Sequence, residues 1–115
     1  MPDPEPAARL MILMDEDRSW NHKPLVDEII RRAHDSGLAG ASAFRGVEGF
    51  GASQLVHTNR ILDLSDKLPI MLLMIDSHAK IEQFLPELAD LDIGGVITVD
   101  DVEVVGPDAP RTVRH

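Results

Sequence analysis

A short segment in the middle of the chain collects residue types that bind anions. The segment, residues 43–60, reads AFRGVEGFGASQLVHTNR, and Arg45 is followed by Gly46, Gly49 and Gly51 in the spacing G-x-x-G-x-G. Glycines allow positive φ angles that can turn backbone N–H groups toward an anion, and arginine binds phosphate through paired hydrogen bonds. From spacing alone, an anion-binding loop and a flexible hairpin are equally good interpretations.

Two other side chains of the segment could contact a ligand. His57 lies near its end, where it could donate a hydrogen bond to an anion and change its charge with pH. Phe50 stands between two glycines, outside any core periodicity, so it could stack on a base or dock on a partner. The spacing differs from the G-x-G-x-x-G dinucleotide fingerprint and no P-loop lysine follows, so neither of these nucleotide motifs is present.

Consecutive acids form a second cluster that could do chemistry. Asp15, Glu16 and Asp17, together with His57, have the ligand types for a divalent cation, although acids ahead of a helix more often interact with its dipole. His57 could also serve as the base of a small hydrolase. The chain has no G-x-S-x-G motif and no evident set of nucleophile, base and acid, so we expect that it is not an enzyme. A metal-binding trimer and a small hydrolase are the alternatives.

The acidic composition of the chain excludes some partners. Its 115 residues include 20 Asp and Glu against 11 Lys and Arg, for a net charge of −9, so a nucleic acid polymer is not an expected partner. There is no Cys, which excludes disulfides and thiolate metal ligands. No apolar run is long enough to span a bilayer, and the N-terminus lacks the features of a signal peptide. We therefore expect a soluble, cytoplasmic protein.

Apolar runs and helical periodicity predict the elements that must position these residues. We expect strands over residues 9–15, 40–45, 69–76 and 95–105, a weaker strand over 60–64, and helices over 23–36 and 77–88. Pro24 and Gly37 mark the ends of the first helix, and Pro86 should kink or split the second. Glu28 and Arg32 are predicted to pair on the exposed side of the first helix. The order βαββαβ predicts a ferredoxin-like α+β sandwich, with a four-stranded antiparallel sheet and two helices on one face.

A single domain over residues 8–105 is expected between two disordered, proline-containing tails, 1–7 and 106–115. Two helices leave one face of a four-stranded sheet uncovered, yet the runs at 10–14 and 70–75 are apolar at successive positions and therefore apolar on both faces. Because large exposed apolar patches are uncommon on monomers, this pattern favours self-association.

Longer stretches of the sequence carry a family resemblance. The stretch HKPLVDEIIRRAHDSGLAGASAFRGVEGFG contains R-G-x-x-G-F-G after a predicted strand, and the similarity continues through DLSDKLPIMLLMID, KIEQFLPELADL and GGVITVDDVEVV. Over residues 9–105 the chain resembles the bacterial and archaeal family called domain of unknown function 190, which is grouped with PII-like signalling proteins. The resemblance implies a ferredoxin-like fold and a homotrimer packed through its sheets.

The resemblance also implies a regulatory function. Proteins of this kind bind small ligands, often adenine nucleotides, in clefts between subunits, and a loop after the second strand contacts a partner such as a membrane transporter or ion channel. On this sequence the matching ligand-binding positions are Glu16, Lys23, Arg45, Gly46, Gly49, Phe50, Gly51 and His57. We therefore expect a signalling protein for which an adenine nucleotide is the suggested ligand and no cofactor is established.

Overall fold

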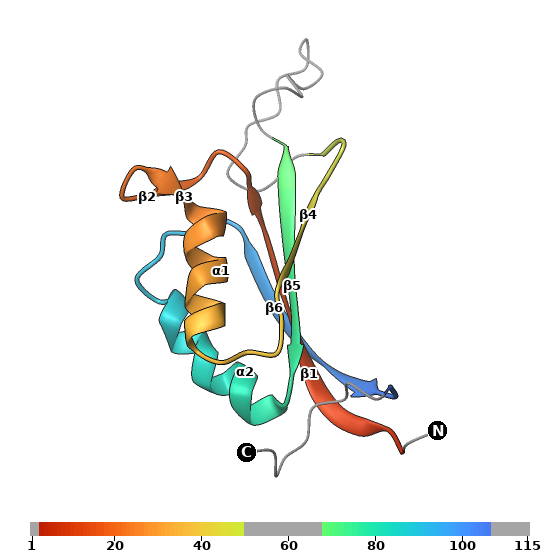
Figure 1. Ribbon diagram of the computed structural model, residues 1–115. Helices are drawn as coiled ribbons and strands as arrows, with labels where there is room; N and C mark the ends of the chain where they lie inside the picture. Colours follow the sequence, from red (N-terminus) through yellow and green to blue (C-terminus); the bar gives the residue numbers. More distant parts are fainter. Residues whose placement is uncertain (1–2, 50–67, 107–115) are drawn as a thin grey trace.

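The computed structural model describes residues 3–49 and 68–106, which form one four-stranded sheet with helices on one side of it (Figure 1). The strands are β1 (Glu5–Asp15), β4 (Ser42–Arg45), β5 (Pro69–Asp76) and β6 (Val96–Val104), in the order β4-β5-β1-β6 with every neighbouring pair antiparallel. Helix α1 spans Leu25–Asp35, helix α2 spans His78–Phe84, and the 3₁₀ helix η1 (Leu85–Leu88) follows directly. The predicted ferredoxin-like α+β architecture is confirmed. None of the described helices has the length and apolar character needed to cross a membrane.

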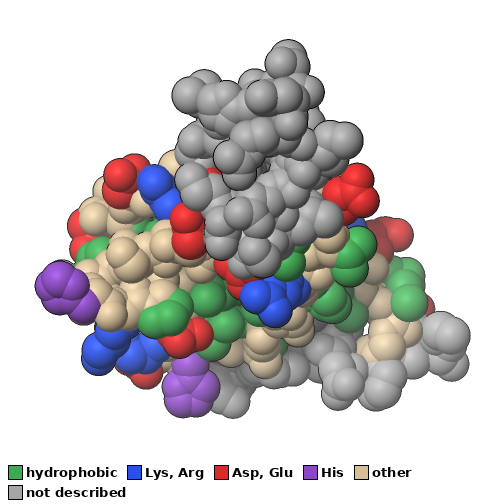
Figure 2. Space-filling view, turned by 90° about the horizontal axis from the view of Figure 1, so that it is seen from above, with side chains coloured by type: hydrophobic (Ala, Val, Ile, Leu, Met, Phe, Trp, Pro, Cys, Tyr) green, Lys and Arg blue, Asp and Glu red, His purple; other side chains and the backbone are tan. Residues whose placement is uncertain are grey.

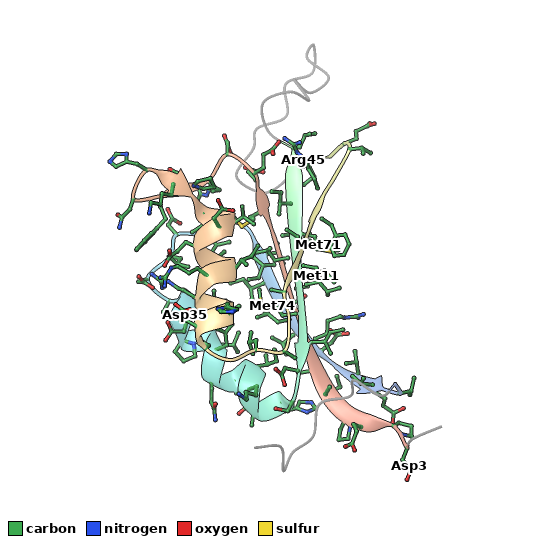
Figure 3. All side chains as sticks on the ribbon, in the orientation of Figure 1. Asp3, Met11, Asp35, Arg45, Met71 and Met74 are labelled. Atoms are coloured by element: carbon green, nitrogen blue, oxygen red, sulfur yellow. The ribbon has the colours of Figure 1, made fainter. Side chains whose placement is uncertain are left out.

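The central strands divide their apolar residues between the two faces of the sheet. On β1, Leu10 is buried beneath the helices, whereas Leu13 on the opposite face keeps 41% of its surface exposed. Figure 3 shows the same division, with Met74 on the helix side and Met11 and Met71 on the other side. The largest fully buried side chains are those of Phe84, Leu10, Ile12, Leu25, Ile29, Leu72, Met74 and Ile81. The described helices therefore cover the apolar residues of β1 and β5 on one face and leave the second face open, as the sequence predicts. On the edge strand β6, Ile97 and Val99 lie on the helix side but remain 43% and 46% exposed.

Strand β1 starts earlier than expected. Residues 5–7, which the sequence placed in a disordered tail, pair with β6, with Glu5 opposite Val104 and Ala7 opposite Val102. The pairing of β1 with β5 reaches only to Ala8, so Pro6 lies where β1 is an edge strand, and proline is tolerated at a sheet edge. The expected N-terminal tail is therefore too long. Residues 107–115 of the expected C-terminal tail, and the weak strand at 60–64, lie outside the described residues.

The ends of the helices follow the predicted signals with small shifts. Pro24 precedes α1 instead of lying in its first turn, because residues 23 and 24 form a short strand, β3 (Lys23–Pro24), paired with β2 (Ser19–Trp20). Gly37, at φ +81°, ends α1, and its N–H donates to the carbonyl of His34 at 3.1 Å. Ser77 caps α2 as its side chain accepts from the N–H of Lys80. Pro86 lies in η1, where the α-helix has given way to a 3₁₀ helix, so the predicted split is confirmed.

A network of charged side chains joins α1 to the segment that follows η1. Glu28 Oε2 lies 2.6 Å from both Arg31 Nη2 and Arg32 Nε. Arg32 also pairs with Asp90 at 2.6 Å, and its guanidinium carbon lies 5.1 Å from the centre of the Trp20 ring. Only 7% of Glu28 is exposed. The predicted Glu28–Arg32 pair therefore forms, but it is buried instead of exposed, because the indole and the Asp90 segment cover this side of α1.

Replacing Glu28 by Gln should lower stability at neutral pH and remove part of its acid dependence. Hydrogen bonds from Arg31, then those from Arg32, lower the pKa of Glu28 from its ordinary value of 4.5 to about 2. A carboxylate with a depressed pKa in the folded state stabilises above its unfolded pKa, and this contribution is lost as the pH falls toward the folded value. The free energies of unfolding of wild type and Glu28→Gln, measured in urea, should therefore converge as the pH falls from 4.5 toward 2.

The exposed Glu82 provides the matched control for this experiment, since Glu82→Gln removes the same charge from the outer side of α2. The free energy of unfolding of Glu82→Gln should differ from that of wild type by a constant amount as the pH falls. A constant difference between wild type and Glu28→Gln across the acid range would show that the buried network does not govern acid stability.

Candidate functional site

Three strands bring their ends together at one end of the sheet. Strands β1 and β4 both finish there, and β5, which lies between them, begins there (Figure 1). Arg45 is the last residue of β4, Glu16 follows the last residue of β1, and Pro69 is the first residue of β5. Two of the predicted ligand-binding residues, far apart in the sequence, therefore arrive at the same place.

Arg45 and Glu16 form an ion pair that spans the width of β5. Arg45 Nη2 lies 2.6 Å from Glu16 Oε2. Arg45 is opposite Ile70 on β5, and Ile70 is opposite Met14 on β1. Opposite residues project to the same face, and Met14 is buried, so Arg45 lies on the helix side of the sheet. Glu16, two residues beyond Met14, shares that side.

The two members of the ion pair differ in their exposure to solvent. The Arg45 side chain is 63% exposed, and the Glu16 side chain is 19% exposed. A guanidinium group has several N–H donors arranged in a planar fork, and among the described residues the ion-pair partner of this one is Glu16. The Glu16 side chain, in contrast, is largely covered. The site therefore presents a cation to solvent and keeps its internal counterion underneath.

Backbone hydrogen bonds hold both residues to the start of β5. The N–H of Glu16 donates to the carbonyl of Leu68 at 2.9 Å, and the N–H of Gly46 donates to the carbonyl of Pro69 at 2.7 Å. Glu16 and the residue after Arg45 are thus both anchored on the same short stretch of chain. The Gly46 N–H is therefore already hydrogen-bonded within the protein and is not free to bind an anion. This removes one of the backbone donors that the sequence suggested for an anion.

The glycines after Arg45 allow the chain to pass close to Pro69. A Cβ atom added to Gly46 would lie 2.6 Å from Pro69 Cγ, which is too short for a real contact, and Gly49 has a φ of +153° that only glycine adopts readily. Both positions therefore favour glycine, Gly46 because of the approach to a proline ring and Gly49 because of its backbone angle. Phe50, Gly51 and His57, the other predicted ligand contacts of this segment, lie outside the described residues.

Lys23 does not join this group. It lies on the β2–β3 hairpin opposite Trp20, and Figure 1 shows that hairpin on the other side of α1 from β4. The hairpin turns through Asn21 and His22, whose φ angles of 50° and 67° fit a type I′ turn. In the described part of the chain, no hydrogen bond or ion pair links Lys23 to Glu16 or Arg45, so the structure separates it from them.

Arg18 positions the turn that carries Glu16, a role that no motif in the sequence predicts. Its Nε donates to the carbonyl of Ile93 at 3.0 Å and its Nη2 to the carbonyl of Asp92 at 2.9 Å. Its own carbonyl accepts from the N–H of Leu25, at the start of α1, at 2.9 Å. Gly94, at φ +66°, leaves the room that the guanidinium fills. Gly94 and Gly95, just before β6, are the sequence feature that could have indicated a close contact here. They are far from Arg18 in the sequence, so the pattern does not reveal which residue they contact.

The acidic cluster does not form a metal site on its own. Among residues 3–49 and 68–106, no group of His, Asp and Glu side chains gathers in the way that would hold a metal ion. The carboxylate of Glu16 is paired with Arg45, and Asp15 is buried and has an interaction of its own. The remaining ligand of the metal-binding alternative, His57, lies outside the described residues, so the described chain does not support that alternative.

Charges of both signs surround this end of the molecule. Figure 2 looks down on it and shows basic and acidic side chains interspersed, without a broad region of either sign. A field of one sign would attract any ligand of opposite charge from a distance. Among the described residues at the ends of β1, β4 and β5, the cation available to attract an anion is Arg45, and its counterion is Glu16.

Comparison with solved structures defines the class of protein to which this fold belongs. CPII from Thiomonas intermedia K12, solved with ADP, AMP and acetate, superposes with a TM-score of 0.68 at 14% identity, covering 96% of this chain and 100% of that one. A PII-like signalling protein from Thermus thermophilus superposes with a TM-score of 0.62 at 18% identity, covering 90% of this chain and 94% of that one. The chain therefore has the PII-like fold.

Sequence relatives identify the particular family. The family described as "DUF190: Uncharacterized ACR, COG1993" matches residues 7–104. A "UPF0166 protein" of Aquifex aeolicus (strain VF5) is 35% identical over 96 residues, which cover 84% of this chain and 90% of the relative. The chain belongs to the DUF190 family, and the resemblance found in the sequence is confirmed.

Proposed function

We propose that this protein is a PII-like signalling protein that binds a small anionic ligand, an adenine nucleotide, at the end of the sheet that carries Glu16 and Arg45. The observation that carries the proposal is the Arg45 side chain, which is 63% exposed at the point where β1, β4 and β5 meet. The PII-like protein CPII has been solved with ADP, AMP and small anions bound. A phosphate is the ligand group best matched to an exposed, positioned guanidinium.

The position of Arg45 offers a route from ligand binding to signalling. Arg45 ends β4 and directly precedes the segment 46–58, so an anion held by its side chain acts at the base of that segment. A ligand that binds one arrangement of the segment more tightly than another shifts the population between them. A partner protein, such as a membrane transporter or ion channel, would respond to that shift. The protein would act in the cytoplasm as a regulator and would not catalyse a reaction.

The protein would also self-associate through its sheet. The side of the sheet away from the helices, here called the open face, is apolar, and its apolar side chains are Met11, Leu13, Phe44, Met71, Leu73, Ile75 and Val96. Apolar faces of this kind are usually buried, and three copies packed through their open faces would bury it. The site at the sheet end would then lie at a subunit boundary, where a neighbouring copy can supply further ligand contacts.

Arg45→Ala should weaken nucleotide binding by about tenfold or more, because it removes charge-assisted hydrogen bonds to the phosphate. The measurement is isothermal titration calorimetry with AMP, ADP, ATP and cyclic AMP on wild type and variant. Lys80→Ala is the matched control, since Lys80 is a cation on α2 whose ammonium contacts the carbonyl of Gly37. The control should bind like wild type. Absence of binding to any nucleotide, or equal affinities in wild type and Arg45→Ala, would refute the proposed function.

A further inference from the structure

The group that an anion must reach is already occupied by an anion of the protein. The Glu16 carboxylate contacts Arg45 at 2.6 Å, and the backbone of Glu16 is fixed by the hydrogen bond from its N–H to the carbonyl of Leu68. The turn after it is fixed as well, through Arg18 and its bonds to Asp92 and Ile93. Glu16 therefore behaves as an internal ligand that is held in place, with little freedom to lose when it binds Arg45.

An incoming anion must exchange with this internal ligand. A carboxylate or a phosphodiester carries a single negative charge. Replacing Glu16 by either therefore leaves the negative charge beside Arg45 unchanged. The exchange also costs the translational and rotational freedom of the incoming molecule, which the tethered carboxylate does not lose. A terminal phosphate monoester carries a charge of about −1.5 to −2 near neutral pH and has more acceptor oxygens. Its attraction to the guanidinium is stronger, so it can displace a carboxylate where a monoanion cannot.

We propose that Glu16 is the specificity-determining residue of this site, and that it restricts binding to ligands with a dianionic terminal phosphate. This inference rests on the proposed function, since it concerns the same Arg45 site. Nucleoside phosphates with a free phosphate monoester are the ligand class that it selects. Cyclic nucleotides and small carboxylates, whose charge equals that of Glu16, are the class that it rejects.

The sign of the selectivity depends on whether Glu16 leaves Arg45 or stays. If the carboxylate stayed, the site would hold two anions side by side, and a dianion would be repelled more strongly than a monoanion. If it leaves, a dianion gains more than a monoanion from the guanidinium. Exchange requires the second case, in which the carboxylate gives up its 2.6 Å contact with Arg45 Nη2 and leaves the guanidinium to the ligand. Tighter binding of a dianion than of a monoanion would therefore indicate that the ligand displaces Glu16 from Arg45.

The experiment compares AMP with 3′,5′-cyclic AMP, which share base, sugar and phosphorus but differ in phosphate charge. Calorimetry on wild type should show that AMP binds about tenfold or more tightly. Glu16→Gln keeps the shape of the side chain and removes its charge. It should strengthen cyclic AMP binding by about tenfold and AMP binding by less, so that the preference for AMP shrinks. Asp17→Asn, which removes the same charge from the exposed neighbouring residue, should leave the preference unchanged.

The outcomes separate this inference from the proposed function. If Arg45→Ala abolishes binding but Glu16→Gln leaves the preference for AMP unaltered, the selectivity role of Glu16 is wrong and the nucleotide site stands. Weaker AMP binding in Glu16→Gln would overturn the inference by showing that the carboxylate contacts the ligand directly. If neither nucleotide binds to wild type or to Glu16→Gln, the proposed function fails and the inference fails with it.

Discussion

Leu13→Lys is expected to convert a self-associated protein into a monomer. Leu13 is central on the open face, opposite Met71 on one neighbouring strand and Val96 on the other, and 41% of it is exposed in the single chain. A lysine there would place a charge inside any interface formed by this face, where it would lose its hydration without a partner. In the isolated chain the same lysine can extend into water, so the variant should fold.

Light scattering coupled to size exclusion provides the measurement. Wild type should show three times the 12.7 kDa mass of the chain, and Leu13→Lys should show the mass of one chain. Gln83→Lys is the matched control, since it adds the same charge to an exposed position on α2. A monomeric wild type would contradict self-association, and a Leu13→Lys variant that remained trimeric would show that the open face is not the interface.

Gly95→Ala is expected to be among the most destabilising single substitutions in the chain. A Cβ atom at residue 95 would overlap the backbone carbonyl oxygen of Leu13. Backbone cannot move aside as a flexible side chain can, and Leu13 is paired with Val96, so any shift would separate β1 from β6. We expect a loss of about 3 kcal/mol, which is a large fraction of the stability of a small domain.

The measurement is urea unfolding of Gly95→Ala, and Gly40→Ala is the control. No heavy atom lies within 4 Å of a Cβ added to Gly40, and its φ is not in the left-handed region. The substitution should change the free energy of unfolding by less than about 0.5 kcal/mol, or raise it slightly, because alanine restricts the unfolded chain more than glycine does. Similar unfolding midpoints for the two variants would mean that the close approach of residue 95 to β1 does not limit stability.

The order of strands and helices could be predicted because it follows from local patterns. Apolar runs identified β1, β5 and β6, a helical period identified α1, and Gly37 and Ser77 marked helix ends whose caps form as expected. The predictions that were wrong depended on neighbours. Residues 5–7 were placed in a tail because proline and acids suggested disorder, and the pairing with β6 was not visible in that stretch.

Glu28 shows the same limit on a helix surface. Its spacing from Arg32 predicted an ion pair, and the pair forms at 2.6 Å. Whether that pair is exposed depends on what lies over it, and Trp20 and the segment around Asp90 come from distant parts of the sequence. The pKa of Glu28 falls to about 2 through its contacts with Arg31 and Arg32, and its burial makes the network part of the structure instead of the solvated surface.

By itself the sequence determined the PII-like class, the apolar character of the core strands on both faces and the residue types at the candidate site. It named Glu16 and Arg45 as separate candidates, one beside a helix and the other before glycines. Only the tertiary structure made them partners, because the strand order β4-β5-β1 sets their strand ends on either side of β5. Periodicity reports the surroundings of a few residues along the chain, whereas strand order and register depend on the whole sheet. The ion pair, and with it the competition for Arg45, follows from that order.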